Sequence, residues 1–407
     1  MDKKFDIIVF GATSFVGKIL SHYLANEHHE PDLQWAMAAR SQSKLDALQN
    51  ELGADAQSIP LIQADSSNEA DMQKLCEQAS LIISTVGPYA LYGELLVKQC
   101  AETGTDYCDL TGEAQWIRRM LNKYEATAQA SGARIVNCCG FDSIPSDLGV
   151  KFLQDQAMQR FGVHCHKIKM RVKTMKGAAS GGTIASGVNL YKEAAKDPAL
   201  REELKDPYSI CPNGHGFSAK QHTVAAEFDE DFDSWAGAFI MAAINTRVVL
   251  RSNALLKPPY HPSFLYDEGT LTGNGDKGKK RAKRLASGLK MGAVVMSIAP
   301  LRWFVTRFFL PKPGEGPSPK EQLEGNYDLR FLGRTENGDE IRVQVTGDRD
   351  PGYGSTGKML AQAGISLCKE VGRDITPGGF WTPATAFDER MLDRLRDHAG
   401  MTFEVID

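Results

Sequence analysis

The sequence predicts an α/β protein with a doubly wound parallel sheet, followed by a second α+β domain that is built on a mixed or antiparallel sheet. The first expectation rests on a buried strand, a glycine turn and a helix within residues 5–24, and on six strands that alternate with helices inside about 140 residues. The second rests on alternating strands that follow one another without a helix between each pair. Those strands are expected at 166–174, 327–332 and 341–346.

The elements of the first region follow from apolar runs and from the turn residues between them. Ile7 to Phe10 form an apolar run with the length of one buried strand, and the helix after it runs from Phe15 to Leu24. Further strands are expected at 33–39, 59–64, 81–86, near 106 and at 134–138, with helices at 41–52, 67–76, 95–102 and 117–130. This is a Rossmann-type alternation, in which ligands bind at the carboxyl edge of the sheet.

Length and composition limit the organisation and the partners of the chain. The 407 residues suffice for about two domains. We expect a dinucleotide-binding domain at 1–150, a substrate and oligomerisation domain at 151–353, and C-terminal helices at 354–407 for which packing on the first domain is one option. A net charge of −4 is too small to indicate nucleic acid as a partner. The eight cysteines contain no Cys-x-x-Cys pair, so we expect no metal and a cytoplasmic protein with reduced thiols.

A phosphate-binding turn is expected between the first strand and the first helix. Its spacing is G-x-x-S-x-x-G rather than the commoner G-x-G-x-x-G. Gly11 permits the turn, Gly17 lets the helix pack close to the strand, and the unpaired N–H groups of the first helical turn attract a phosphate. The Ser14 hydroxyl either binds a phosphate or keeps the cofactor further away. The predicted dinucleotide contacts here are Gly11, Thr13, Ser14, Phe15, Val16 and Gly17.

The end of the second strand favours NADP over NAD. An acidic residue there would bind the ribose hydroxyls of NAD, but the chain has Arg40 followed by Ser41. A guanidinium beside a hydroxyl suits the 2′-phosphate of NADP, although Arg40 could instead be solvated or stack on adenine. NADP is therefore the preferred cofactor, and NAD is the second choice. Asp65, which follows the third strand, is expected near the adenine.

The loops after the later strands supply the other predicted site residues. The segment Val86, Gly87 and Pro88 is expected beside the diphosphate and the nicotinamide, because a glycine allows a close approach to the backbone. Candidates to orient the substrate or transfer a proton are Tyr89, Tyr107, Asp142 and Ser143. Packing is the alternative role for the tyrosines, and capping of the helix that begins near Pro145 is the alternative for the other two.

A basic and apolar stretch lies at residues 277–310. Seven lysines and arginines come before an uncharged run at 291–301, and aromatic residues surround Arg302 and Arg307 after it. The uncharged run is too short to span a bilayer, which needs about 20 residues. Three interpretations fit this pattern. The stretch binds a membrane interface, or it binds the acidic surface of an acyl carrier, or it consists of a solvated loop followed by a helix in the core or in a dimer interface. A homodimer and a peripheral membrane location are therefore both open.

Seven blocks along the chain form a recognisable set. They are Gly-Ala-Thr-Ser-Phe-Val-Gly at 11–17, Ala-Arg-Ser at 39–41, Thr-Val-Gly-Pro-Tyr at 85–89, Asp-Tyr-Cys-Asp-Leu-Thr-Gly-Glu at 106–113, Cys-Gly-Phe-Asp-Ser-Ile-Pro-Ser-Asp at 139–147, Gly-Gly-Thr at 181–183 and Gly-Gly-Phe-Trp-Thr-Pro-Ala at 378–384. Together they resemble the saccharopine-dehydrogenase-like oxidoreductases. The block at 139–147 is most similar to trans-acting enoyl reductases that serve polyketide synthases and to a membrane- and lipid-droplet-associated branch. The resemblance implies an NAD(P)-dependent oxidoreductase and leaves its substrate open.

Two classes of function fit these observations. The first is an NADPH-dependent oxidoreductase that reduces an enoyl or related unsaturated acyl substrate, either a small molecule or an acyl thioester. A saccharopine-type imine reductase or dehydrogenase is the enzymatic alternative, and its substrate would need arginines for two or more carboxylates. Arg171, Arg247 and Arg251 are available, but nothing in the sequence groups them. The second class is a nucleotide-binding scaffold at a membrane or lipid surface without turnover.

Overall fold

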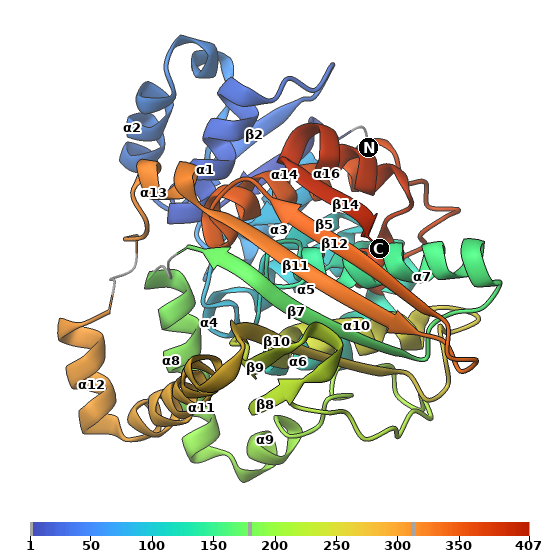
Figure 1. The fold of residues 1–407 in the computed structure, drawn as a ribbon. Coiled ribbons are helices and arrows are strands. Elements are labelled where there is room, and N and C mark those ends of the chain that lie inside the picture. The colour runs from blue at the N-terminus through green and yellow to red at the C-terminus, as the bar shows by residue number, and fades with distance from the viewer. Residues whose placement is uncertain (1–2, 178–180, 311–313, 407) are drawn as a thin grey trace.

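Two seven-stranded sheets organise the chain in the computed structural model, which describes residues 3–177, 181–310 and 314–406 (Figure 1). We name the first of them sheet A and the second sheet B. Every neighbouring pair of strands in sheet A is parallel. Sheet B is mixed, because one of its strand pairs is parallel and the others are antiparallel. The predicted fold class is therefore confirmed.

Sheet A has the strand order β13-β6-β5-β4-β1-β2-β3. Its strands are β1 Phe5–Phe10, β2 Trp35–Ala39, β3 Leu61–Gln63, β4 Ala79–Ser84, β5 Asp106–Asp109, β6 Arg134–Val136 and β13 Gly379–Trp381. Ile7, Ile8 and Val9 are fully buried, because a central parallel strand is covered on both faces. The chain leaves β1 in one direction toward β2 and later returns to its other side with β4, so the sheet is doubly wound.

Helices from both ends of the chain cover sheet A. From the N-terminal part they are α1 Phe15–His22, α2 Gln42–Leu52, α3 Glu69–Gln78, α4 Tyr89–Tyr92, α5 Glu94–Thr103 and α6 Ala114–Ser131. The C-terminal part adds α14 (Thr356–Lys369), which contacts β1, β4 and β5, and it adds β13, which pairs with β6 at the edge. The C-terminal segment thus completes both sheet A and its helical layer.

Sheet B has the strand order β14-β12-β11-β7-β10-β9-β8. Its strands are β7 Lys167–Lys176, β8 Ala226–Asp229, β9 Ser234–Ala238, β10 Leu265–Gly273, β11 Asn326–Arg334, β12 Glu340–Gly347 and β14 Met401–Ile406. The hairpin of β11 and β12 turns at Glu336 to Asp339.

The remaining helices come from the middle and the C-terminal part of the chain. They are α7 Ile144–Phe161, α8 Gly181–Lys196, α9 Pro198–Glu203, α10 Ala242–Leu255, α11 Gly275–Ser297, α12 Ala299–Phe308, α13 Pro319–Glu324, α15 Pro383–Ala386 and α16 Arg390–Ala399. Helix α7 contacts β11, β12 and β14, and α10 contacts both α7 and β10. Helix α8 contacts α4 of the first region and α11 of the second.

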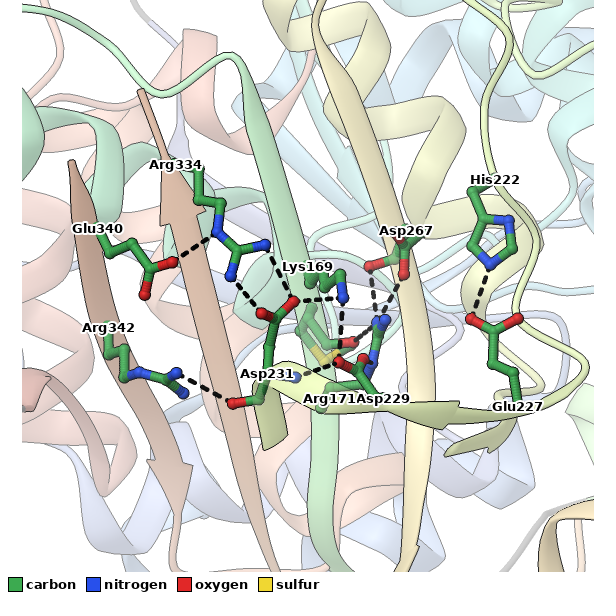
Figure 2. A network of polar contacts seen from close by, with 11 residues as sticks. Lys169, Arg171, His222, Glu227, Asp229, Asp231, Asp267, Arg334, Glu340 and Arg342 are labelled. Atoms are coloured by element: carbon green, nitrogen blue, oxygen red, sulfur yellow. Dashed lines mark hydrogen bonds and ion pairs between the residues drawn. The ribbon is translucent and has the colours of Figure 1, made fainter. Parts of the chain in front are cut away.

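A network of ion pairs lies on the face of sheet B opposite the apolar side of β7 (Figure 2). Arg171 is fully buried and pairs with Asp229 at 2.7 Å and with Asp267 at 2.6 Å. Lys169 pairs with Asp229 at 3.0 Å and with Asp231 at 2.5 Å. Burial of Asp229 opposes its ionisation, but the charges of Arg171 and Lys169 lower its pKa overall. The network therefore holds the segment after β8 against the centre of the sheet.

Candidate functional site

The turn after β1 takes the form that a phosphate-binding site requires. Gly11 has a φ of +88°, and a Cβ there would lie 2.7 Å from both the Thr85 hydroxyl oxygen and a Val86 methyl carbon. A Cβ on Gly17 would overlap the Gly11 carbonyl oxygen. Only glycine fits either position without displacing the backbone, since the obstacles include backbone atoms and the left-handed region disfavours a side chain. The turn and the helix start are thus held close to the end of β4.

The Ser14 hydroxyl caps the helix that follows this turn. Its oxygen accepts a 2.9 Å hydrogen bond from the Gly17 backbone N–H and lies 2.9 Å from the Thr85 hydroxyl oxygen. Thr85 in turn donates to the Gly11 carbonyl at 2.9 Å. The sequence offered two roles for Ser14, phosphate contact or spacing, and the structure adds a third, in which it joins the β1 turn to β4. Thr85 is a site residue that the sequence analysis did not identify.

The start of α1 offers an anion site that faces the second sheet. The N–H groups of the first helical turn have no partner within a helix, and the helix dipole favours a negative charge there. Because Ser14 takes the N–H of Gly17, those of Phe15 and Val16 remain for a phosphate. The ring of Phe15 packs edge-on against that of Tyr353, with centroids 5.1 Å apart. The Tyr353 hydroxyl oxygen lies 3.2 Å from the hydroxyl oxygen of Thr183 on α8, so the segment after β12 links this turn to α8.

Arg40, Ser41 and Asp65 lie at the carboxyl ends of β2 and β3, beside the glycine turn. The Arg40 side chain is exposed and forms no ion pair with any residue that the structure describes. Hydrogen bonds from the Ser67 backbone N–H and hydroxyl lower the pKa of Asp65, and the nearby Arg40 charge adds to this effect. Ser41 caps α2 through its hydroxyl, at 3.4 Å from the Lys44 nitrogen. The Arg40 guanidinium is therefore free to bind a 2′-phosphate, which is the role that the sequence predicts for it.

The loop Val86–Pro88 follows β4 and is held by Glu113. Gly87 is exposed, while Val86 and Pro88 are partly buried. The Glu113 carboxylate accepts hydrogen bonds from the backbone N–H groups of Tyr89 at 2.8 Å and Ala90 at 3.0 Å. The same carboxylate accepts a 2.7 Å hydrogen bond from the Ser186 hydroxyl on α8. Glu113 is therefore a second residue whose part in the site the sequence analysis did not identify.

Two of the predicted catalytic residues, Tyr89 and Tyr107, are directed into the interior. The Tyr89 hydroxyl donates to the Ser84 carbonyl at 2.9 Å, and the Tyr107 hydroxyl donates to the Asp109 carboxylate at 3.0 Å. Burial raises the pKa of both phenols well above the usual value, and the charge of Asp109 raises it further. This arrangement favours packing, the alternative role that the sequence analysis left open for them.

Asp142 is the predicted catalytic residue whose side chain is left without a described partner. Its side chain is partly exposed and has no hydrogen-bond partner in the part of the chain that the structure describes. A Cβ on Gly112 would lie 3.2 Å from an Asp142 carboxylate oxygen, so Gly112 leaves room for this group. Burial raises the pKa of Asp142 to about 7, with a further contribution from the negative charge of Asp109. This carboxyl therefore keeps its proton to a higher pH than an ordinary aspartate does.

Ser143, in contrast, belongs to a buried polar chain. It precedes α7 but makes no capping hydrogen bond through its side chain. Its hydroxyl donates to the Asn245 side-chain oxygen at 3.2 Å, and the Asn245 amide donates to the Glu268 carboxylate at 3.0 Å. The Tyr266 hydroxyl also donates to Glu268, at 2.7 Å. Ser143 thus connects the start of α7 to β10 and is fully buried, whereas its neighbour Asp142 is partly exposed.

The three arginines considered for a carboxylate-rich substrate are all engaged inside the protein. Arg171 is in the ion-pair network of sheet B. Arg247 donates to Ser209 and to the carbonyls of Ala243 and Leu204. Arg251 donates to the Ile210 carbonyl at 2.6 Å and to the Phe380 carbonyl at 2.7 Å. The described residues contain no group of three or more acidic, histidine or cysteine side chains arranged to hold a metal ion.

Comparison with protein sequences places this arrangement among known enzymes. A family profile described as “Saccharopine dehydrogenase NADP binding domain” matches residues 7–136. A Mycobacterium tuberculosis protein that is provisionally named a trans-acting enoyl reductase is 35% identical over 406 residues, which cover 97% of this chain and 96% of that protein. The trans-acting enoyl reductase of Mycobacterium bovis is 33% identical over 417 residues, with the same coverage of both chains.

Solved structures share the fold at low sequence identity. The saccharopine dehydrogenase (L-Glu forming) of Saccharomyces cerevisiae aligns over 99% of this chain and 100% of its own, with a TM-score of 0.53 and 13% identity. The homospermidine synthase of Legionella pneumophila, solved in complex with NAD, aligns over 99% of this chain and 92% of its own, with a TM-score of 0.54 and 11% identity. At these identities the likeness concerns the fold alone.

Proposed function

The chain belongs to the saccharopine-dehydrogenase-like oxidoreductases and has their NADP-binding domain, and from this premise we propose that it uses NADPH to reduce the carbon–carbon double bond of an enoyl thioester or a related unsaturated acyl substrate. The observation that carries the proposal is Asp142, a partly exposed carboxyl with a raised pKa and no partner in the described residues. The names of the relatives that are 33% and 35% identical agree with this reaction.

The predicted cofactor contacts would hold NADPH along the carboxyl edge of sheet A. In this proposal the turn at Gly11, Thr13 and Ser14 and the N–H groups of Phe15 and Val16 bind the diphosphate. Arg40 and Ser41 bind the 2′-phosphate, Asp65 lies near the adenine, and Val86 to Pro88 border the nicotinamide. The tight approach of Gly11 and Gly17 to neighbouring atoms supports this placement, because added side chains would close the space above the turn.

When it is bound, NADPH supplies the hydride that the β-carbon of the double bond accepts. The protein then needs an acid to protonate the α-carbon, and Asp142 is the carboxyl at this edge that can hold a proton near pH 7. Its partial burial makes the carboxylate left after proton transfer unfavourable, and its partial exposure allows it to regain a proton from water. Glu113 and Ser186 keep α8 close to the loop after β4, which bounds the space for the substrate.

A saccharopine-type imine substrate is less well supported by the contacts. Such a substrate has several carboxylates, and these are usually bound by arginines with free donors. Arg171, Arg247 and Arg251 already donate to carboxylates, hydroxyls or carbonyls within the protein. An enoyl thioester needs no such arginines, so the engaged arginines favour it over the imine.

The test is an assay with trans-2-enoyl thioesters of several chain lengths, in which the loss of NADPH absorbance is followed. Asp142→Asn should lower kcat by a factor of about 10²–10⁴ while the Kd for NADPH stays unchanged. Asp55→Asn, at an exposed position on another surface, is the matched control and should behave as the wild type. The wild-type kcat should also fall as the pH rises through about 7, and the Asp142→Asn variant should lack this dependence.

Three outcomes would contradict the proposal. A wild-type kcat in the Asp142→Asn variant would show that another group donates the proton. If NADPH is oxidised in the presence of an imine precursor but not with any of the enoyl thioesters, the protein catalyses the saccharopine-type reaction. Tight binding of NADPH without turnover of either substrate class would favour the scaffold.

A further inference from the structure

Helices α11 and α12 form a surface that the proposed reaction does not use. The two helices follow each other along the chain with a bend of 108°. Helix α11 packs against β8, β9 and β10, and in Figure 1 α12 stands at the edge of the molecule beyond α8. Over the described ranges, no single helix combines the length and the apolar character needed to cross a membrane. Helices α11 and α12 reach that length and apolar character only when they are counted together.

Large apolar side chains are exposed along this pair. They are Met291, Val294, Ile298, Leu301, Trp303, Phe304, Phe308 and Phe309. Trp303 is 63% exposed and Phe309 is 70% exposed. The rings of Phe304 and Phe308 contact each other, with centroids 5.2 Å apart, but both side chains are exposed as well. No residue of α12 is buried. So many large apolar side chains exposed on two consecutive helices of a folded protein indicate a binding surface, because water is an unfavourable environment for them.

Basic side chains accompany the apolar ones. Residues 277–310 contain nine lysines and arginines and no acidic residue, although the whole chain has a net charge of −4. The basic residues are Lys277, Lys279, Lys280, Arg281, Lys283, Arg284, Lys290, Arg302 and Arg307. None of them forms an ion pair with another described residue. The positive charge is therefore concentrated on α11 and α12 and is available to a partner.

We infer that α11 and α12 dock the protein on the surface of an anionic lipid bilayer. Tryptophan and phenylalanine favour the interfacial layer of a bilayer, and clustered lysines and arginines are attracted to anionic headgroups. A second copy of the chain is a poorer partner, because two like-charged surfaces would be brought together. The acidic surface of an acyl carrier would balance the charge but would not cover the aromatic side chains of α12.

The docking surface lies next to the proposed active site. Helix α11 contacts α8, and α8 carries Thr183 and Ser186, which bond to Tyr353 and Glu113. A protein docked through α11 and α12 would therefore hold the α8 side of its site close to the lipid. This suits a substrate with a long acyl chain, a consequence that rests on the proposed function, whereas the docking itself does not.

The experiment is flotation of the purified protein with two kinds of vesicle, one of phosphatidylcholine alone and one of equal parts phosphatidylcholine and phosphatidylglycerol. The wild type should float with the anionic vesicles. An aromatic variant with Trp303→Ser, Phe308→Ser and Phe309→Ser should float at least tenfold less. A charge variant with Lys280→Glu, Arg281→Glu and Arg284→Glu should lose the preference for phosphatidylglycerol. A control with Lys74→Glu, Arg160→Glu and Lys220→Glu makes the same charge change on other exposed surfaces and should float as the wild type.

Binding of NADPH is measured on every variant and should be unchanged, which shows that each is folded and separates this test from that of the reaction. Absence of the wild type from the floating anionic vesicles would overturn the inference. Equal flotation of the wild type and the aromatic variant would also overturn it. If the wild type floats with neither vesicle but forms a dimer that the aromatic variant loses, the surface binds a second copy, and the lipid assignment is wrong.

Discussion

The Ser186 hydroxyl donates a 2.7 Å hydrogen bond to the Glu113 carboxylate, and this contact joins α8 to the first sheet. The two residues are 73 positions apart in the sequence. Because the same carboxylate also accepts the N–H groups of Tyr89 and Ala90, one buried side chain holds the loop after β4, the start of α4 and α8 together. In the proposed function these three elements border the nicotinamide and the substrate.

The first prediction concerns this carboxylate. Glu113→Gln has one acceptor oxygen in place of two, so at least one of the buried donors loses its partner, at a cost of about 1–3 kcal/mol in the free energy of unfolding. We expect kcat/KM to fall while NADPH still binds, because the phosphate turn is not changed. Urea unfolding and steady-state kinetics measure both effects. Glu389→Gln, at an exposed position without a described partner, is the control, and equal behaviour of the two variants would contradict the prediction.

The second prediction concerns cofactor choice. Arg40→Ala should weaken the binding of NADPH about ten- to hundredfold, since a charge-assisted hydrogen bond to a phosphate contributes about 1.5–3 kcal/mol. The affinity for NADH should change little, because NADH lacks the 2′-phosphate. Fluorescence titration of each cofactor gives the two Kd values, with Lys74→Ala as a control for the loss of one exposed positive charge. Equal losses for both cofactors would mean that Arg40 contacts another part of the dinucleotide.

The third prediction concerns stability as a function of pH. The pKa of Asp142 is raised to about 7 in the folded protein and is about 3.9 in an unfolded chain. Between these values the folded state keeps a proton that the unfolded state has released, so this group lowers stability as the pH rises. Asp142→Asn removes the effect. Its free energy of unfolding relative to the wild type should therefore increase between pH 5 and pH 8, by about 1–2 kcal/mol for a partly exposed group. Urea unfolding at the two pH values measures the change, and a constant difference would show that the folded-state pKa is not raised.

The fourth prediction concerns the ion-pair network of sheet B. Asp229→Ala removes a carboxylate from the buried Arg171 and should lower the free energy of unfolding by about 3–5 kcal/mol. Glu202→Ala breaks the exposed ion pair with Lys205 and should change the free energy of unfolding by less than about 1 kcal/mol. Chemical unfolding of both variants checks the contrast. A similar small loss in both would show that Asp267 alone suffices for Arg171.

Much of sheet A could be predicted because its signals are local. The apolar run before Gly11 and the helix start after it contain all the information needed for the phosphate turn, and the strands that follow repeat the same alternation. Sheet B was harder to predict. Strand β10 includes Asp267 and Glu268, two acids that a sequence reading does not place in a buried strand. They are tolerated there because Arg171 and Asn245, which come from other elements, provide partners.

The sequence by itself determined the fold class, the glycine turn after the first strand and the positions of the candidate residues along the chain, since each depends on neighbouring residues. Only the tertiary structure decided which of those residues are accessible. Tyr107 and Ser143 lie in buried hydrogen-bond networks, whereas Asp142 stands partly exposed, although Asp142 and Ser143 are neighbours in the same loop. The tertiary structure also identified Thr85 and Glu113 as candidate site residues. Buried polar groups need hydrogen-bond partners, and the partners of these two residues come from distant parts of the chain.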